Sequence, residues 1–145
     1  MRLKGVQYMY GLNINFDYDI TKEYRLKYER QCDCAYCRNY YKTFKMNYPN
    51  ISKFLEEFGL DIEFPLEIMP LEYNKLDDKM EYISYYPVKG TINKDKLILN
   101  LDQAEIRVLK GSDSNNPCPN PKMKEPYLLI EIARIKLPWV LDENP

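Results

Sequence analysis

The stretch Tyr127-Leu-Leu-Ile-Glu-Ile-Ala-Arg-Ile-Lys-Leu-Pro-Trp139 carries the pattern that decides the fold. Apolar residues recur at every second position up to Ile132, as they do on a strand with one buried face. From Ile135 they recur again, but with the opposite parity. A bulge of one residue at Ala133 or Arg134 returns both sets to the same face. The pattern therefore predicts one long, bulged strand.

A β-hairpin is predicted upstream of this strand. Residues 96–101 and 104–109 each alternate in polarity, and only Asp102 and Gln103 separate them. Two alternating segments joined by two polar residues are typical of a hairpin. The two segments therefore form a neighbouring pair of antiparallel strands.

Two further strands are predicted at residues 68–73 and 80–88, on either side of a polar stretch. Pro70 lies in the first of them and Pro87 in the second. Because proline has no N–H to donate to a neighbouring strand, each of these positions is predicted to be an edge or a bulge.

The N-terminal segment has the strictest alternation in the chain. Apolar or aromatic residues stand at every even position from Val6 to Ile20. This period predicts one strand with one buried face, with Gly11 at a bulge or bend. A second strand is predicted from Tyr24, after a turn. Since Tyr24 and Tyr28 are four residues apart, a short helix is the alternative there.

Between these strand regions the period changes to that of a helix. Cys37, Tyr41, Phe44 and Tyr48 recur at helical spacing, and a second apolar helical face runs from residue 51 to residue 58. We therefore predict an α+β fold: an antiparallel β-sandwich or half-barrel with a two-helix insertion near residues 34–59. No linker divides the chain, so residues 1–145 are predicted to form a single domain.

Composition excludes several functions. The 145 residues contain no histidine, which rules out an imidazole base, a Ser-His-Asp or Cys-His pair and a histidine metal ligand. The 21 basic and 22 acidic residues give a net charge of −1, so no nucleic-acid or membrane partner is expected. No long apolar run and no signal pattern is present, which predicts a cytoplasmic protein.

Three cysteines form a Cys-x-Cys-x-x-Cys motif at Cys32, Cys34 and Cys37, and Cys118 lies far away in a proline-rich loop. Four thiolates can bind one Zn²⁺ tetrahedrally, so these residues are the predicted metal ligands and zinc the possible cofactor. One alternative is a set of ordinary reduced thiols. Another is a redox pair of Cys34 and Cys37, because a helix N-terminus lowers a thiol pKa.

Tyrosines are the candidate binding residues. Tyr40 belongs to an aromatic series at helical spacing, which could bind a planar ligand but more often forms core. Tyr85 and Tyr86 are neighbours on a predicted strand and point to opposite faces. If only one face of that strand is covered, one of the two rings is exposed and available to a partner.

Several stretches of the chain are distinctive when taken together: Cys32–Tyr41, residues 58–61 and 65–67, Tyr85–Gly90, residues 125–131 and Leu137–Leu141. They resemble a group of small uncharacterised proteins from low-GC Gram-positive bacteria and their mobile elements. The resemblance spans roughly residues 15–142. It implies one domain in which the cysteine cluster is part of the shared pattern, and it implies no catalytic residue.

Two functions follow as hypotheses. The first is a non-catalytic binding protein for a protein or small-molecule partner, such as an immunity or anti-defence factor from a mobile element or phage. It predicts an exposed aromatic patch. The alternative is a small thiol-dependent redox protein or enzyme that uses the cysteine cluster, which predicts a thiol of low pKa.

Overall fold

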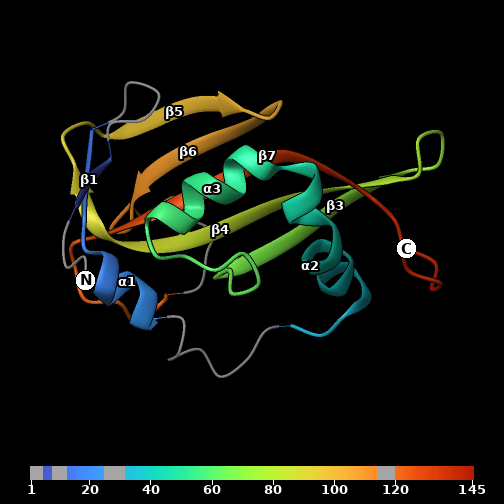
Figure 1. Cartoon of the computed structure of the whole chain (residues 1–145), viewed down its shortest axis with the longest axis horizontal. Coiled ribbons are helices and arrows are strands. Elements are labelled where there is room, and N and C mark those ends of the chain that lie inside the picture. The colour runs from blue at the N-terminus through green and yellow to red at the C-terminus, as the bar shows by residue number, and fades with distance from the viewer. Residues whose placement is uncertain (1–4, 8–12, 25–31, 114–119) are drawn as a thin grey trace.

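The computed structural model describes residues 5–7, 13–24, 32–113 and 120–145. In these residues a curled antiparallel sheet of seven strands forms a half-barrel with three helices (Figure 1), which confirms the predicted α+β class. In chain order the elements are β1 (Gly5–Gln7), β2 (Ile14–Phe16), α1 (Tyr18–Tyr24), α2 (Ala35–Asn47), α3 (Pro49–Glu57), β3 (Glu67–Asn74), β4 (Lys79–Ile92), β5 (Lys96–Leu101), β6 (Ala104–Lys110) and β7 (Tyr127–Pro138).

The two longest strands, β4 and β7, lie at the centre of the sheet. The strand order is β1-β2-β4-β7-β6-β5, and β3 also pairs with β4. The edge of β4 that faces away from β7 has two partners: β3 pairs with the first part of β4, up to Tyr85, and β2 pairs with its last part, from Gly90 onward. Pro87 lies between these two partners, and Pro70 lies at the irregularity of β3. Both prolines therefore occupy the kind of position predicted for them.

The predicted bulge is present in β7. Tyr82 of β4 pairs with Ile135, and Ser84 pairs with Ile132, so two residues of β7 stand opposite one residue of β4. One of the two, Arg134, has a φ of 62°. As a result the apolar residues before and after the bulge are buried on the same face.

The β5–β6 hairpin also forms as predicted, and its turn touches a helix. Asp102 and Gln103 have φ values of 52° and 68°, as a two-residue hairpin turn requires. The Asp102 carboxylate accepts the backbone N–H groups of Asn50 and Ile51 at 2.9 and 3.0 Å. N–H groups in the first turn of a helix have no partner within the helix itself, so the hairpin turn at Asp102 caps α3.

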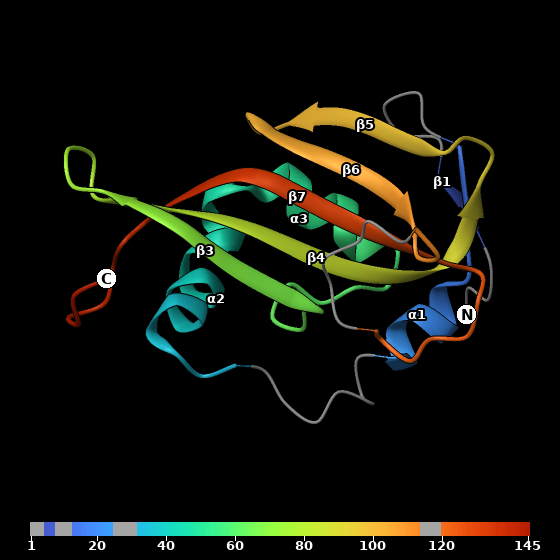
Figure 2. The same cartoon turned by 180° about the vertical axis from the view of Figure 1, so that it is seen from behind.

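Helices α2 and α3 form the predicted two-helix insertion and cover one face of the curled sheet. They lie in front of β4 and β7 in Figure 1 and behind them in Figure 2. Gly59, with a φ of 90°, follows the end of α3 and has the left-handed conformation that commonly ends a helix. Between helices and sheet lies the main core; its fully buried members include Tyr40, Phe44, Phe54, Phe58, Tyr82, Tyr86, Ile106 and Leu137.

The prediction of a single strand over residues 6–20 is wrong. β1 and β2 have three residues each, Gly11 lies outside the described residues, and α1 begins at Tyr18. The Asp17 carboxylate accepts the N–H of Ile20 at 3.0 Å, which favours a helix start over a continued strand. Tyr24, the predicted first residue of the second strand, is instead the last residue of α1, and residues 25–31 lie outside the described part of the chain, so the rest of that prediction is not tested. Tyr28 lies outside the described residues.

Candidate metal site

Three cysteine side chains meet at the start of α2. The Sγ atoms of Cys32, Cys34 and Cys37 all lie within 4.8 Å of one another. Around a tetrahedral Zn²⁺ with bonds of about 2.3 Å, sulfur atoms are about 3.8 Å apart. A shift of about 1 Å or less therefore brings these thiols to the spacing of metal ligands. The three cysteines could hold a metal ion.

The backbone around the thiols is shaped by the helix N-terminus. Cys34 is the N-cap residue in extended conformation, and its Sγ accepts the N–H of Cys37 at 3.5 Å. Arg38 donates to the carbonyl of Asp33 at 3.0 Å, and the Tyr41 hydroxyl donates to the carbonyl of Cys32 at 3.3 Å. The helix dipole favours negative charge at this position, as thiolate ligands carry.

The three thiols differ in exposure. Cys32 and Cys34 are exposed, whereas Cys37 is buried against the core. Burial, and secondarily hydrogen bonding with the Cys34 and Cys32 thiols, raises the pKa of the Cys37 thiol. A raised pKa is the opposite of what an attacking thiol needs, so Cys37 gives no support to the redox hypothesis.

The fourth predicted ligand, Cys118, lies outside the described residues, which omit 114–119. The described part of the chain therefore contains a cluster of three thiols. Spacing alone located that cluster, because all three residues lie within six positions of one another.

The predicted binding tyrosines lie in the interior. Tyr40 and Tyr86 are fully buried and Tyr85 is 2% exposed, so the expectation of one exposed ring at Tyr85 or Tyr86 is wrong. The hydroxyls of Tyr40 and Tyr86 are 2.8 Å apart, and Tyr86 donates to the carbonyl of Ile62 at 2.7 Å. Tyr85 points to the other face and donates to Glu131 at 2.8 Å. Both faces of β4 are covered here, whereas the prediction assumed one open face.

No exposed aromatic patch is found in the part of the chain that the structure describes. The large apolar side chains exposed there are aliphatic, and they lie on different elements. These residues are Ile20, Met46, Leu71, Leu76, Ile98 and Val140. Among the candidate binding residues, Tyr40, Tyr85 and Tyr86 therefore contribute to packing and internal hydrogen bonds.

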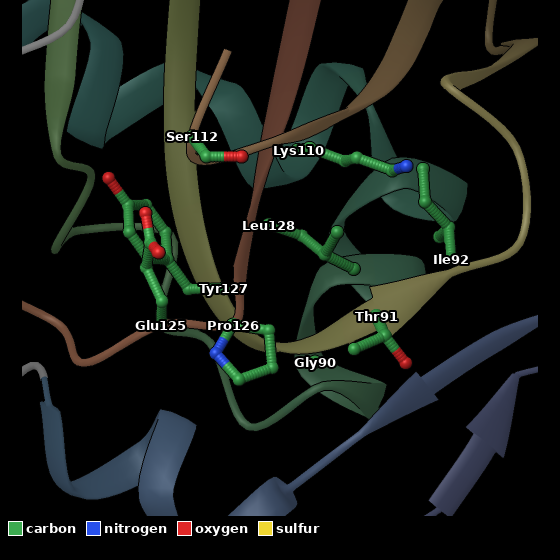
Figure 3. A pocket seen from close by; sticks show the side chains of 9 residues that line it. All are labelled: Gly90, Thr91, Ile92, Lys110, Ser112, Glu125, Pro126, Tyr127 and Leu128. Atoms are coloured by element: carbon green, nitrogen blue, oxygen red, sulfur yellow. The ribbon is translucent and has the colours of Figure 1, made fainter.

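A small pocket of about 170 Å³ lies at the end of the sheet where β4, β6 and β7 meet (Figure 3). Leu128 forms its floor, Lys110 and Ser112 line one side, and Glu125 and Tyr127 line another. Pockets for organic ligands usually have roughly 300–1,000 Å³, so this one is too small for most of them. No local sequence pattern predicts this pocket, because three separate segments build it.

Comparisons with protein-family models, with curated proteins and with solved structures found no match. In the described residues, no helix has the length and apolar character needed to cross a membrane. The function must therefore be argued from the residues of this chain, and the cysteine cluster is the feature with the most definite chemistry.

Proposed function

We propose that this chain is a non-catalytic binding protein in which the cysteine cluster holds a structural Zn²⁺ ion. The observation that carries the metal part is the convergence of three Sγ atoms within 4.8 Å at the start of α2. Thiolates are soft ligands that favour zinc over magnesium or calcium. With no histidine in the chain, cysteine thiolates and carboxylates are the zinc ligands that its side chains can supply, and the thiolates are the ones gathered at this site.

Cys118 is the proposed fourth ligand. Structural zinc sites are closed by four protein ligands, and Cys118 is the one cysteine outside the motif. Bound there, zinc would join the start of α2 to the proline-rich loop at residues 111–126. Such a cross-link fixes two segments that are distant in sequence, which is the usual contribution of a structural zinc ion.

The binding part of the proposal is supported by composition, because the chain contains no histidine for an imidazole base; the aromatic patch that this hypothesis predicts is not found among the described residues. The buried hydroxyls of Tyr40 and Tyr86 have structural partners, including the Ile62 carbonyl and the Ser84 hydroxyl. They are thereby engaged in holding helices to the sheet. We infer that the protein acts by occupying a partner's surface, as an immunity or anti-defence factor from a mobile element would.

The test is the zinc content of freshly purified protein, measured by inductively coupled plasma mass spectrometry. Wild type should contain one equivalent, and Cys34→Ser should lose it. Asp33→Asn is the matched control, because it alters the same loop without removing a thiol, and it should retain zinc. Cys118→Ser should lower the zinc content if the site has four thiolates. Metal-free wild type with all four thiols reactive after unfolding would refute the metal site.

A further inference from the structure

The cysteine cluster adjoins the docking site of the C-terminal tail, residues 139–143. In both views the chain ends beside the start of α2 (Figures 1 and 2). Asn39, fully buried on α2, donates through Nδ2 to the carbonyl of Pro138 at 3.1 Å. Its Oδ1 accepts the N–H of Val140 at 2.9 Å. One side chain near the cluster therefore binds the backbone on both sides of Trp139.

Arg38 connects the cysteine segment to the end of the tail. Its Nε donates to the carbonyl of Asp33, which lies between two of the cysteines. Its guanidinium also forms an ion pair with Glu143, at 2.7 Å between Nη1 and Oε1. Trp139 Nε1 donates to the carbonyl of Glu143 at 2.6 Å and so closes the tail into a turn.

The ring of Trp139 packs against the same segment. Tyr36, located between Cys34 and Cys37, makes an edge contact with Trp139 at 5.8 Å between ring centroids. Trp139 is only 9% exposed. The backbone N–H of Trp139 also donates to the carbonyl of Asp78. The backbone is therefore held up to Val140 by the sheet and by Asn39, while the Trp139 ring and Glu143 contact the first turn of α2.

We propose that metal occupancy of the cysteine cluster controls docking of the C-terminal tail. This inference rests on the proposed zinc site. Without metal, the start of α2 is weakly held, because its N-cap is a thiol at 3.5 Å and its first turn contains no acidic residue. The first turn of a helix held this way frays readily.

Bound zinc joins Cys32, Cys34 and Cys37 and so fixes the residues between them. Those residues are the ones that hold the tail: the Asp33 carbonyl orients Arg38, and the Tyr36 ring packs on Trp139. Loss of zinc frees the turn, releases Glu143 and exposes the Trp139 ring. Because coupling between two sites is reciprocal, a docked tail also strengthens zinc binding by the same factor.

Trp139 is the only tryptophan of the chain, so its fluorescence reports on the tail alone. Zn²⁺ has a filled d shell and is redox-inactive, which keeps the readout simple. Removing zinc with a chelator should shift the emission to longer wavelength and raise acrylamide quenching about twofold, with the far-UV circular dichroism retained. Adding Zn²⁺ should reverse both changes. Cys34→Ser should show the exposed state with and without added Zn²⁺.

A second measurement tests reciprocity. Glu143→Gln removes the ion pair with Arg38 and should weaken zinc binding about threefold in a chelator competition. Glu56→Gln is the matched control, because it removes a surface ion pair with Lys45 on the helices, and it should leave zinc affinity unchanged.

The outcomes separate the two proposals. Stoichiometric zinc with no change in Trp139 fluorescence on chelation would overturn tail control and leave the zinc site standing. Chelation that abolishes the circular dichroism would also overturn it, because zinc would then hold the whole fold. Protein that binds no zinc would overturn both proposals.

Discussion

Deleting Ala133 and Arg134 together should reverse the faces of the C-terminal half of β7, whereas deleting Arg134 alone leaves Ile132 and Ile135 in regular alternation on one face. The bulge places Ala133 and Arg134 opposite one residue of β4, so Ile135 and Leu137 face the core together with Ile132. With both residues removed, Ile135 follows Ile132 directly, so regular pairing turns Ile135 and Leu137 to the outer face and brings Lys136 inward. If Ile135 and Leu137 instead stayed on the core face, the end of β7 would lose its regular pairing with β4.

The loss can be estimated from burial. Ile135 and Leu137 are both fully buried, and moving each to the surface costs about 1.5–3 kcal/mol. The two together account for about 3–6 kcal/mol, and displacement of Trp139 adds to this. A domain is usually stable by only about 5–15 kcal/mol, so the deletion should remove most of the free energy of unfolding.

The assay is urea unfolding followed by circular dichroism, with Arg134→Gly as the control. Arg134 has a φ of 62°, a conformation that glycine adopts freely, whereas for other residues it costs about 1–2 kcal/mol. Its ion pair with Glu105 is long, at 3.9 Å, and exposed. Arg134→Gly should therefore be neutral or about 1 kcal/mol more stable. A variant lacking both Ala133 and Arg134 that stays within about 1 kcal/mol of wild type would refute this assignment of faces around the bulge.

Three further predictions concern the core and the caps. Tyr86→Phe removes a buried hydroxyl and should lower the free energy of unfolding in urea by about 1–3 kcal/mol. Tyr73→Phe, which removes a hydroxyl at the surface, should change it little, and equal effects of the two variants would contradict this prediction. Asp102→Ala removes the cap of α3 and should lower the free energy of unfolding by about 1–2 kcal/mol. Asp102→Asn keeps an acceptor and tolerates positive φ, so it should lower the free energy of unfolding less; the reverse order would be evidence against the cap. Burial raises the pKa of Tyr40, Tyr82 and Tyr86, that of Tyr82 to about 12. Because the unfolded chain loses these protons near pH 10, the contribution of the three tyrosines to the free energy of unfolding is intact below about pH 10 and is lost as the pH rises toward 12 and beyond. Urea unfolding at pH 9, 10 and 11 should show stability falling by up to about 1.4 kcal/mol per pH unit for each tyrosine, and constant stability over this range would contradict it.

The candidate site was predictable in part. The spacing of Cys32, Cys34 and Cys37 is local, and a helix start brings such neighbours together whatever the rest of the chain does. The tyrosines were not predictable in the same way. Whether Tyr85 or Tyr86 reaches solvent depends on what covers each face of β4, and those covering groups come from distant parts of the chain.

By itself, the sequence determined the features that depend on neighbouring residues. These are the β5–β6 hairpin, the bulge of β7, the paired helices and the cysteine cluster, because side-chain period, turn chemistry and spacing are local properties. The break of the N-terminal alternation at Asp17 is also local, because the Asp17 carboxylate caps a helix that starts within three residues, and the strand pattern alone does not predict it. Only the tertiary structure decided that a sheet turn caps α3. It also decided that the C-terminal tail docks beside the cysteines. Asn39 and Val140 are about 100 positions apart, and no local pattern encodes a contact that forms only when the core brings α2 and β7 together.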